Sequence, residues 1–335
     1  MGRKLIVLLD GAWNNQEDRT NVTRMKESIV STGENDPLQP FFYHPGVGQH
    51  WYDRMTGGAF GRGLSRNIQE GYQWLAQRMR ADDELFVFGF SRGAYTARSL
   101  VGLIRKCGLL RTADDAMVRQ AYDLYRDKTV APDDPTAVAF RSSFAHEPRV
   151  RFIGVWDTVG SLGIPLSYVP FGKDYYSWHD TELSKIVDYA DNAIAVDEHR
   201  KDFQVAVWTK TKEKNEDVEQ RWFVGAHGNV GGGYHRSPPD LLPDITLRWM
   251  QDKAAAVGLA LHAKVEVAAA APMRPVDDSY GAFMFGVYKR FKHPFQRSFG
   301  RGVNEKVDDS VWLRWRQDEN YRPATLLGHP DRPQR

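Results

Sequence analysis

A serine flanked by two glycines is the first residue in the chain whose setting could support catalysis. Residues 89–93 read Gly-Phe-Ser-Arg-Gly, which places Ser91 in a Gly-x-Ser-x-Gly pattern. An apolar run at 84–88 leads directly into this segment, and a run of helical composition leaves it at Ala94. A serine on so sharp a strand-to-helix turn projects its hydroxyl above the sheet, where it can attack an ester carbonyl. The setting therefore predicts a nucleophile at Ser91.

Other interpretations of this segment are weaker. A serine between two packing glycines could simply cap the helix that follows it. A phosphate-binding loop needs Gly-x-x-x-x-Gly-Lys followed by Ser or Thr, and the chain has no such segment. The glycine fingerprint of a dinucleotide site is also missing. Helix capping is thus the structural alternative to a nucleophile.

A histidine late in the chain could serve as the base. In hydrolases with this serine turn, the order along the chain is nucleophile, acid and then histidine. His227 follows the apolar run 222–226 and precedes a glycine-rich turn at 228–234. A neutral imidazole within reach of Ser91 could take its proton during attack and return it to the leaving group. His235 and His199 are competing candidates, and a loop histidine with a purely structural role is the alternative.

The acid is harder to choose, because several carboxylates lie between Ser91 and His227. Asp157 follows the apolar run 150–156, and the end of a parallel strand faces the same edge of a sheet as Ser91. Asp197 is a second candidate, although its carboxylate could instead cap the following segment. Three more acidic residues lie in the segment 209–220, where they look like a solvated surface: Glu213, Glu216 and Asp217. Asp157 is the favoured acid.

Backbone amides near Ser91 could hold the negative oxygen that forms during attack. The amide of Arg92 lies at the start of the predicted helix, and a second amide should come from Gly11 or Ala12 in the loop after the first strand. Asp10 could brace that loop through its backbone amides or help to hold a cation. The chain has no His/Cys cluster with zinc spacing and no His-Glu-x-x-His motif. We therefore predict no required metal and no cofactor.

Short apolar runs alternate with longer amphipathic ones, as expected when helices join the strands of a mostly parallel sheet. The predicted strands are 4–9, 40–44, 84–88, 150–156, 203–208 and 221–226. The predicted helices are 64–79, 94–104, 113–127 and 241–259, with a surface excursion at 129–148. No repeat or linker divides the chain. We therefore expect one α/β domain over 1–335 with a loop-rich part at 260–335.

Charge and cysteine content exclude several classes of protein. The chain has 45 basic and 43 acidic residues, and a net charge of +2 gives no general attraction for nucleic acid. Cys107 is the single cysteine, so no internal disulfide can form. The apolar run 5–9 is too short for a signal-peptide core. We expect a protein that is cytoplasmic in its producer and that needs a dedicated secretion machine to act elsewhere.

Taken together, these segments resemble a known family, the uncharacterised α/β-hydrolase domain family that includes the type VI secretion phospholipase effectors of Gram-negative bacteria. The strongest similarity lies in LLDGAWN at 8–14, YHPGVG at 43–48, FGFSRGA at 88–94, GVWDTVG at 154–160, AVDEHR at 195–200, WFVGAH at 222–227 and VGGGY at 230–234. Weaker similarity lies at 310–311 and 321–323. The resemblance covers nearly the whole chain.

Two positions depart from the family pattern. Residue 12 is alanine where the family commonly has threonine, which matters little if only its backbone amide is used. Asn229 stands where the family usually has aspartate, which removes a carboxylate near His227 and favours Asp157 as the acid. The larger effectors of the family also look as if they carry an added membrane-anchoring region.

The resemblance implies an enzyme that cleaves fatty-acyl esters of phospholipids in a rival's membrane, with delivery by type VI secretion to the target's periplasm and an immunity protein in the producer. Residues 280–301 mix aromatic and basic side chains, which suits the surface of an anionic bilayer. A packed segment with solvated basic residues is the favoured alternative there, and nucleic-acid binding is the least favoured. An esterase for small soluble esters and a catalytically silent binding module remain the competing functions.

Overall fold

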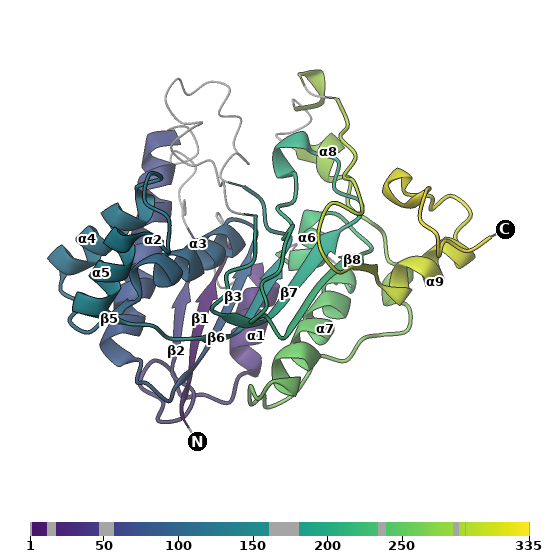
Figure 1. Ribbon diagram of the computed structural model, residues 1–335. Coiled ribbons are helices and arrows are strands. Elements are labelled where there is room, and N and C mark those ends of the chain that lie inside the picture. Colours follow the sequence, from purple (N-terminus) through teal and green to yellow (C-terminus); the bar gives the residue numbers. More distant parts are fainter. Residues whose placement is uncertain are drawn as a thin grey trace.

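A parallel sheet forms the centre of the computed structural model, which describes residues 2–11, 18–46, 57–160, 181–233, 239–283, 288–291 and 293–334 (Figure 1). Its strands are β1 (Lys4–Leu9), β2 (Phe41–His44), β3 (Glu84–Phe90), β6 (Val150–Trp156), β7 (Val187–Ala195), β8 (Asp217–Phe223) and β9 (Glu305–Val307). They lie in the order β2-β1-β3-β6-β7-β8-β9, and every neighbouring pair is parallel. The two-residue strands β4 (Leu109–Leu110) and β5 (Ala145–His146) pair separately and antiparallel.

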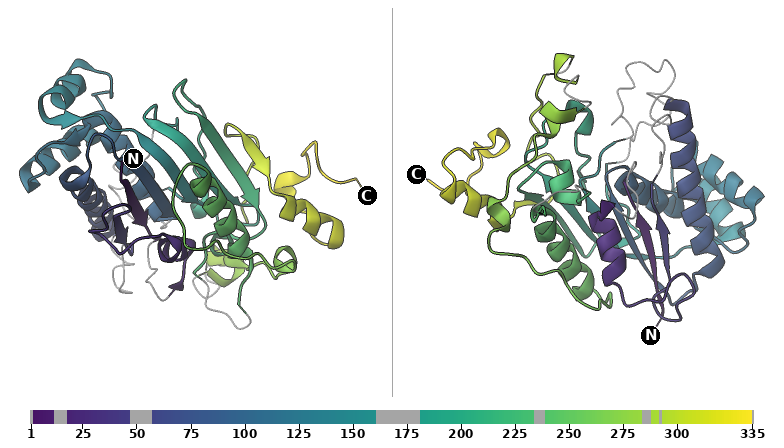
Figure 2. Two further views of the ribbon diagram at one scale, coloured as in Figure 1. Left: turned by 90° about the horizontal axis from the view of Figure 1, so that it is seen from below. Right: turned by 180° about the vertical axis from the view of Figure 1, so that it is seen from behind.

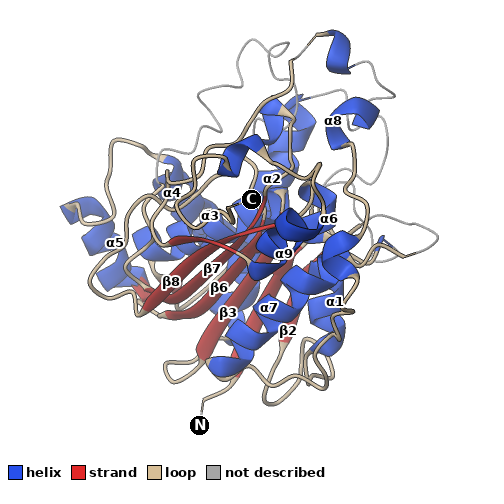
Figure 3. Cartoon of the chain, turned by 90° about the vertical axis from the view of Figure 1, so that its right-hand side faces the viewer, coloured by secondary structure: helices blue, strands red, loops and turns tan. Residues whose placement is uncertain are grey.

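Helices cover both faces of the sheet, as Figures 2 and 3 show from other sides. They are α1 (Asn21–Ser28), α2 (Gly57–Arg78), α3 (Arg92–Cys107), α4 (Asp115–Arg126), α5 (Pro135–Phe144), α6 (His227–Gly231), α7 (Leu242–Ala256), α8 (Ser279–Ala282) and α9 (Asp309–Gln317). Short 3-10 turns lie at η4 (Lys201–Phe203), η5 (Ala271–Met273), η7 (Tyr288–Arg290) and η8 (Ala324–Leu326). The predicted fold class, an α/β-hydrolase-like sheet flanked by helices, is confirmed.

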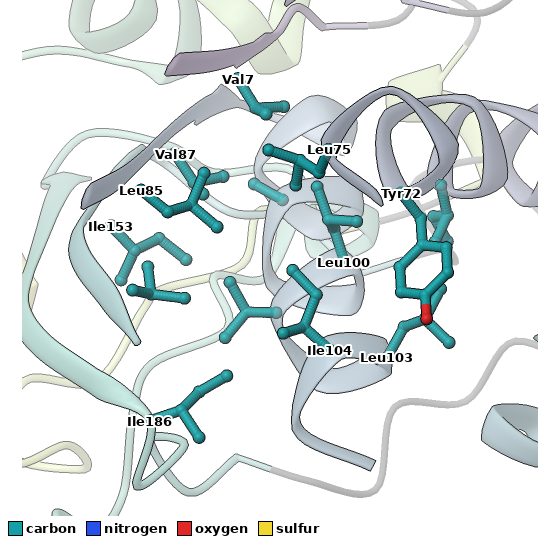
Figure 4. Packing of buried hydrophobic residues seen from close by; sticks show 14 of the residues in the cluster. Val7, Tyr72, Leu75, Leu85, Val87, Leu100, Leu103, Ile104, Ile153 and Ile186 are labelled. Carbon is teal, nitrogen blue, oxygen red and sulfur yellow. The ribbon is translucent and has the colours of Figure 1, made fainter. Parts of the chain in front are cut away.

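The strands β1, β3 and β6 are mostly apolar, as expected for strands that are buried on both faces. Alternate side chains point to opposite faces, so Val7, Val87 and Ile153 pack with α2, α3 and α4 on one side. Figure 4 shows these residues facing Leu100 and Ile104 of α3. On the other side, strand residues such as Phe88 pack with α1 and α7. Packing on both faces holds these strands in place, and their C-terminal ends carry the site.

A third cluster lies at the far end of the sheet. Ile194 of β7 and Trp222 of β8 pack there against Trp312 and Trp315 of α9. β9 extends the sheet beyond β8, and the Nε1–H of Trp222 donates a hydrogen bond to Glu305 at 2.8 Å. The C-terminal part is therefore joined to the sheet by both a strand and an apolar cluster.

Two parts of the predicted element list were wrong. Residues 203–208 do not form a central strand: a 3-10 turn ends at Phe203, and only an isolated bridge joins Val205 to Val159. The strand in that part of the sheet is β7, at Val187–Ala195. The excursion at 129–148 also contains α5 and β5.

Polar residues interrupt the apolar pattern of β7, so the sequence does not indicate a buried strand there. Its Asp188 accepts a hydrogen bond from Arg149 at 2.6 Å, and its Asp191 lies 3.4 Å from the ammonium of Lys253. Because these partners lie on other segments, a buried strand can carry carboxylates that its own sequence does not explain.

Within the described ranges, no helix has the length and apolar composition that a membrane crossing requires.

Candidate active site

Ser91 lies on a strained turn between the end of β3 and the start of α3. Its φ of 59° and ψ of −119° are rarely adopted by residues other than glycine. The backbone amide of Ser91 donates to the carbonyl of Trp156 at 2.9 Å, and the carbonyl of Ser91 accepts from Tyr95 at 3.2 Å. These bonds from two elements hold the turn in place, so the sequence-predicted strand-to-helix setting is present.

A glycine is needed at position 93 for the same turn to form. A Cβ atom there would lie 2.1 Å from the carbonyl oxygen of Leu9 and 2.4 Å from that of Asp10. Such a distance is far inside van der Waals contact, and both atoms belong to the backbone of a central strand and its loop. The close approach brings the start of α3 against the loop after β1.

Three side chains from different strand ends form a continuous hydrogen-bonded row. The Nε2 atom of His227 lies 2.8 Å from the Oγ of Ser91, and its Nδ1 lies 2.6 Å from the Oδ2 of Asp157. All three side chains are buried. The structure thus brings together the residues that the sequence predicts as nucleophile, base and acid.

The imidazole of His227 is held from several sides. Its ring packs against Phe90, with centroids 4.7 Å apart, and against the edge of Phe203 at 5.1 Å. Its backbone amide donates to Glu198 at 3.3 Å. Burial lowers the pKa of His227 below its ordinary value, although the hydrogen bond and charge of Asp157 act in the opposite direction. A neutral imidazole at neutral pH can accept the proton of Ser91.

Asp157 follows β6 and is fully enclosed. Its φ is 42°, and its amide donates to the carbonyl of Ala193 at 2.7 Å, which turns the carboxylate toward His227. Burial alone would raise the pKa of Asp157, but the charge of Arg297 and the hydrogen bonds from His227 and Arg297 hold it well below its usual range. The carboxylate is therefore ionised at neutral pH.

Arg297 is the residue of this site that sequence reasoning missed. The sequence presents it as one of several cations in the mixed segment 280–301, yet its side chain is only 3% exposed. Its two terminal nitrogens donate to the two oxygens of Asp157 at 2.5 and 2.9 Å. The pair is 140 residues apart in sequence, and no local pattern around Arg297 indicates such a partner.

The other acid and base candidates have different partners. The Oδ2 of Asp197 accepts from the amide of Gly225 at 2.8 Å and from the hydroxyl of Tyr321 at 3.0 Å. A ring nitrogen of His199 lies 3.1 Å from the carbonyl oxygen of Phe295. The residues at 213–217 lie where β8 begins. Ser91 follows the C-terminal end of β3, so the two lie at opposite ends of the parallel strands. His235 lies outside the described residues.

Asp10 braces the loop after β1. Its Oδ1 accepts from the amide of Gly11 at 2.7 Å, and its Oδ2 accepts from Thr20 at 2.6 Å, Thr23 at 3.1 Å and Tyr43 at 3.1 Å. Burial raises the pKa of Asp10, with these hydrogen bonds acting against it. The donors around the carboxylate favour a structural role over a cation site, and no three His, Cys, Asp or Glu side chains of the described ranges gather to hold a metal ion.

The amides proposed for the oxyanion are differently placed. Arg92 is the first residue of α3, where backbone amides have no partner within the helix. The amide of Gly11 already donates to Asp10, which leaves Ala12 as the candidate from that loop. Ala12 lies outside the described residues.

Asn229 is one of the departures from the family pattern, and its hydrogen-bond partners explain the asparagine. Its Oδ1 accepts from the amides of Ala226 at 3.0 Å and Asp277 at 3.1 Å. Its Nδ2 donates to the carboxylates of Asp240 at 2.8 Å and Asp277 at 2.6 Å. An aspartate here would face two other carboxylates without a donor. The asparagine therefore stabilises the helix that carries His227.

Comparison with known proteins places this site in context. An uncharacterised protein of Saccharomyces cerevisiae (strain ATCC 204508 / S288c) is 26% identical over 235 residues, which cover 62% of this chain and 33% of that protein. Among solved structures, an uncharacterised protein from Pseudomonas aeruginosa is similar with a TM-score of 0.47 and 16% identity, over 78% of this chain and 46% of the other. The thermophilic Thermogutta terrifontis esterase 2 is similar with a TM-score of 0.39 and 12% identity, over 79% and 86%.

This chain thus spans about a third of the yeast protein and less than half of the Pseudomonas protein. A family model matches residues 3–253, a range that includes Ser91, Asp157 and His227. That model describes the catalytic domain of the type VI secretion system (T6SS) phospholipase effectors called Tle1-like. The family to which the sequence showed a resemblance is thereby confirmed, and the chain belongs to the Tle1-like phospholipase effector catalytic domains of the T6SS.

Proposed function

We propose that this hydrolase cleaves carboxylic esters of phospholipids through an acyl-enzyme on Ser91, and that residues 1–335 act as one catalytic unit. The observation that carries the proposal is the unbroken row from Ser91 through His227 to Asp157 on a strained strand-to-helix turn. The row has the arrangement of a Ser-His-Asp triad, in which the acid orients the imidazole and the imidazole activates the serine.

The proposed reaction assigns a role to each member of the row. The Oγ of Ser91 attacks the ester carbonyl while His227 Nε2 takes its proton, and the amide of Arg92 with that of Ala12 holds the oxyanion. Collapse of the tetrahedral intermediate breaks the bond to the alcohol oxygen, which receives the proton from His227. A water molecule then gives its proton to His227 and attacks the acyl carbonyl. Release of the fatty acid restores Ser91.

A lipid substrate is supported by the family and by an exposed tip of the chain. Phe291 is 75% exposed and follows the exposed cations Lys289 and Arg290 of η7. Buried Tyr288 anchors this tip: its hydroxyl donates to Asp202 at 2.8 Å, and its ring packs on Phe283. We refer to residues 288–291 as the basic tip.

The basic tip is linked by packed aromatic rings to the C-terminal ends of the parallel strands, where Ser91 and His227 lie. We refer to this end of the sheet as the catalytic edge. Phe283 packs on Phe203 with centroids 5.6 Å apart, and Phe203 in turn contacts the ring of His227. An aromatic side chain with neighbouring cations suits the interface of an anionic bilayer. Contact at this tip would bring a membrane toward the part of the molecule that holds His227. Delivery by type VI secretion and neutralisation by an immunity protein in the producer complete the proposed role.

The proposal is tested by mass spectrometry of products after mixed phospholipids are incubated with the wild-type chain or with Ser91→Ala. Release of fatty acid and lysophospholipid by the wild type alone is the expected result. A fluorophosphonate probe should label the wild type, fail to label Ser91→Ala, and label His227→Ala weakly. Cleavage of short soluble esters that exceeds cleavage of vesicles would indicate an esterase for small substrates instead.

A further inference from the structure

Arg297 holds the candidate acid in a way that has a functional consequence. Its Nη1 donates to Asp157 Oδ1 at 2.5 Å and to the carbonyl of Ala195 at 2.9 Å. Its Nη2 donates to Asp157 Oδ2 at 2.9 Å and to the carbonyl of Phe203 at 2.6 Å. This planar fork matches the carboxylate geometrically, which an ammonium group cannot do. Four hydrogen bonds from one buried guanidinium thus join the acid to the end of β7 and to η4.

The same oxygen of Asp157 serves both Arg297 and His227. Oδ2 accepts from the Nη2 of Arg297 at 2.9 Å and lies 2.6 Å from the Nδ1 of His227. An unpaired carboxylate in this position would strongly favour the protonated imidazole, since opposite charges stabilise each other in a buried site. The guanidinium offsets part of that charge. It thereby weakens the hold of Asp157 on a proton at His227.

The remaining charged groups around His227 are already balanced. Glu198 accepts from the amide of His227, and Arg200 binds both Glu198 oxygens at 2.8 Å. The hydroxyl of Ser279 donates to the same carboxylate at 3.0 Å, and the guanidinium of Arg200 lies 3.5 Å from the centre of the Phe203 ring. Two carboxylates therefore face two guanidinium groups. Removing Arg297 alone leaves one negative charge uncompensated beside the imidazole.

We propose that Arg297 is a positioning residue that keeps Asp157 ionised and aimed at His227, and that it sets the lower pH limit at which His227 can activate Ser91. This inference rests on the proposed catalytic roles of those three residues. Arg297 also lies beyond residues 3–253, the range that the family model matches. The part of the chain after that range thus completes the catalytic site.

The test compares Arg297→Met, Arg297→Gln and Arg297→Lys with the wild type. The rate of fluorophosphonate labelling and kcat/KM for a soluble ester are measured from pH 4 to 9. Because burial lowers the pKa of His227 from its ordinary value, the acid limb of the wild-type profile should lie at a lower pH than that of an exposed histidine. Met and Gln remove the charge and should move this limb up by about one pH unit. Lys retains the charge and should leave the limb near its wild-type position while slowing labelling.

Arg314→Met is the matched control. Arg314 is also buried in the C-terminal part, where it donates to the carbonyls of Pro272 at 3.1 Å and Arg274 at 2.6 Å. Its loss removes the same charge without touching Asp157, so the acid limb should stay in place. An acid limb that is unchanged in Arg297→Gln, or an Arg297→Lys variant with the wild-type labelling rate, would overturn the inference.

The two neutral variants guard against loss of folding, since Gln retains two donors for the surrounding carbonyls while Met does not. Thermal melting identifies a variant that does not fold, and the other neutral variant then decides. Failure of the proposed function gives a different result. In that case the wild type is not labelled, or labelling persists in Ser91→Ala, whatever the behaviour of the Arg297 variants.

Discussion

Asp157 receives hydrogen bonds from three different described segments, and one of the three donors is the imidazole of His227. Replacement by Asn keeps the size of the side chain but offers an amide where the imidazole needs an acceptor. The imidazole is then held in the wrong tautomer, and we expect kcat to fall by about 10⁴-fold. Steady-state kinetics with a soluble ester measure this effect.

Asp197→Asn is the comparison for that variant. Asp197 is also buried, but it binds Gly225 and Tyr321 rather than the imidazole. Its replacement should lower thermal stability and leave kcat within about tenfold of the wild type. Equal losses of kcat in the two variants would argue against Asp157 as the acid.

Single residues of the site differ in how far the sequence can predict them. Ser91, Asp157 and His227 each follow an apolar run, so strand ends and the family order favour them, although the same signals left other carboxylates and histidines open. Arg297 follows no strand and belongs to a segment that has the composition of a basic surface. Its role depends on a fold that brings it to a residue 140 positions earlier, which no local pattern encodes.

At the scale of elements, the contact between α3 and the loop after β1 depends on Gly93. A Cβ atom in Gly93→Ala would meet the carbonyl oxygen of Leu9 at 2.1 Å. Relief requires α3 to move away from the strand, so we expect the free energy of unfolding to fall by about 3 kcal/mol or more. Labelling of Ser91 should be lost as well. Denaturant unfolding and the fluorophosphonate probe measure the two effects.

Gly71→Ala provides the control within a neighbouring helix. The nearest atom to a Cβ atom at Gly71 is a side-chain carbon of Leu100 at 3.6 Å, an ordinary contact. Alanine in a helix interior should raise stability by about 0.5–1 kcal/mol and leave labelling unchanged. If Gly93→Ala behaved like Gly71→Ala, the close approach of α3 to β1 would be wrong.

Elements are predictable where burial is expressed as an apolar run. The strands β1, β3 and β6 are buried on both faces, and their apolar runs locate them within a few residues of their ends. β7 is not predictable in this way, because Asp188, Asp191 and Asn192 interrupt its apolar pattern. Conversely, the alternating pattern at 203–208 predicts a strand that does not form. The backbone carbonyl of Phe203 instead accepts a hydrogen bond from Arg297. Side-chain partners on distant segments decide both cases.

At the scale of the molecule, the basic tip should matter only when the substrate is a membrane. Phe291→Ser removes an aromatic side chain whose burial in a bilayer contributes about 1.5–3 kcal/mol. We expect binding to anionic vesicles to weaken about tenfold, with unchanged kcat/KM for a short soluble ester. Vesicle sedimentation and the soluble-ester assay separate the two.

Leu38→Ser is the control for that experiment. Leu38 is 70% exposed, and it precedes β2 at the opposite edge of the sheet from Ser91. Its replacement removes an exposed apolar side chain away from the catalytic edge, so vesicle binding should not change. Equal weakening by both substitutions would show that binding depends on general surface apolarity and not on the basic tip.

Several hydrogen bonds of the described residues join the C-terminal part to the segments that hold the catalytic row. They include the bonds of Asp277 with Asn229, Ser279 with Glu198, Arg297 with Asp157 and Tyr321 with Asp197. Each of these contacts joins a late residue to a loop that carries or flanks a member of the row. The row is therefore supported by residues that follow it in the chain.

This support has a consequence for the timing of activity during synthesis. A ribosome adds Ser91, Asp157 and His227 before it adds any of their C-terminal supports. A nascent chain that has formed most of its sheet still has an acid without its guanidinium. If Arg297 sets the acid limb as proposed, a nascent chain that ends before Arg297 should need a higher pH for the activation of Ser91 than the complete chain.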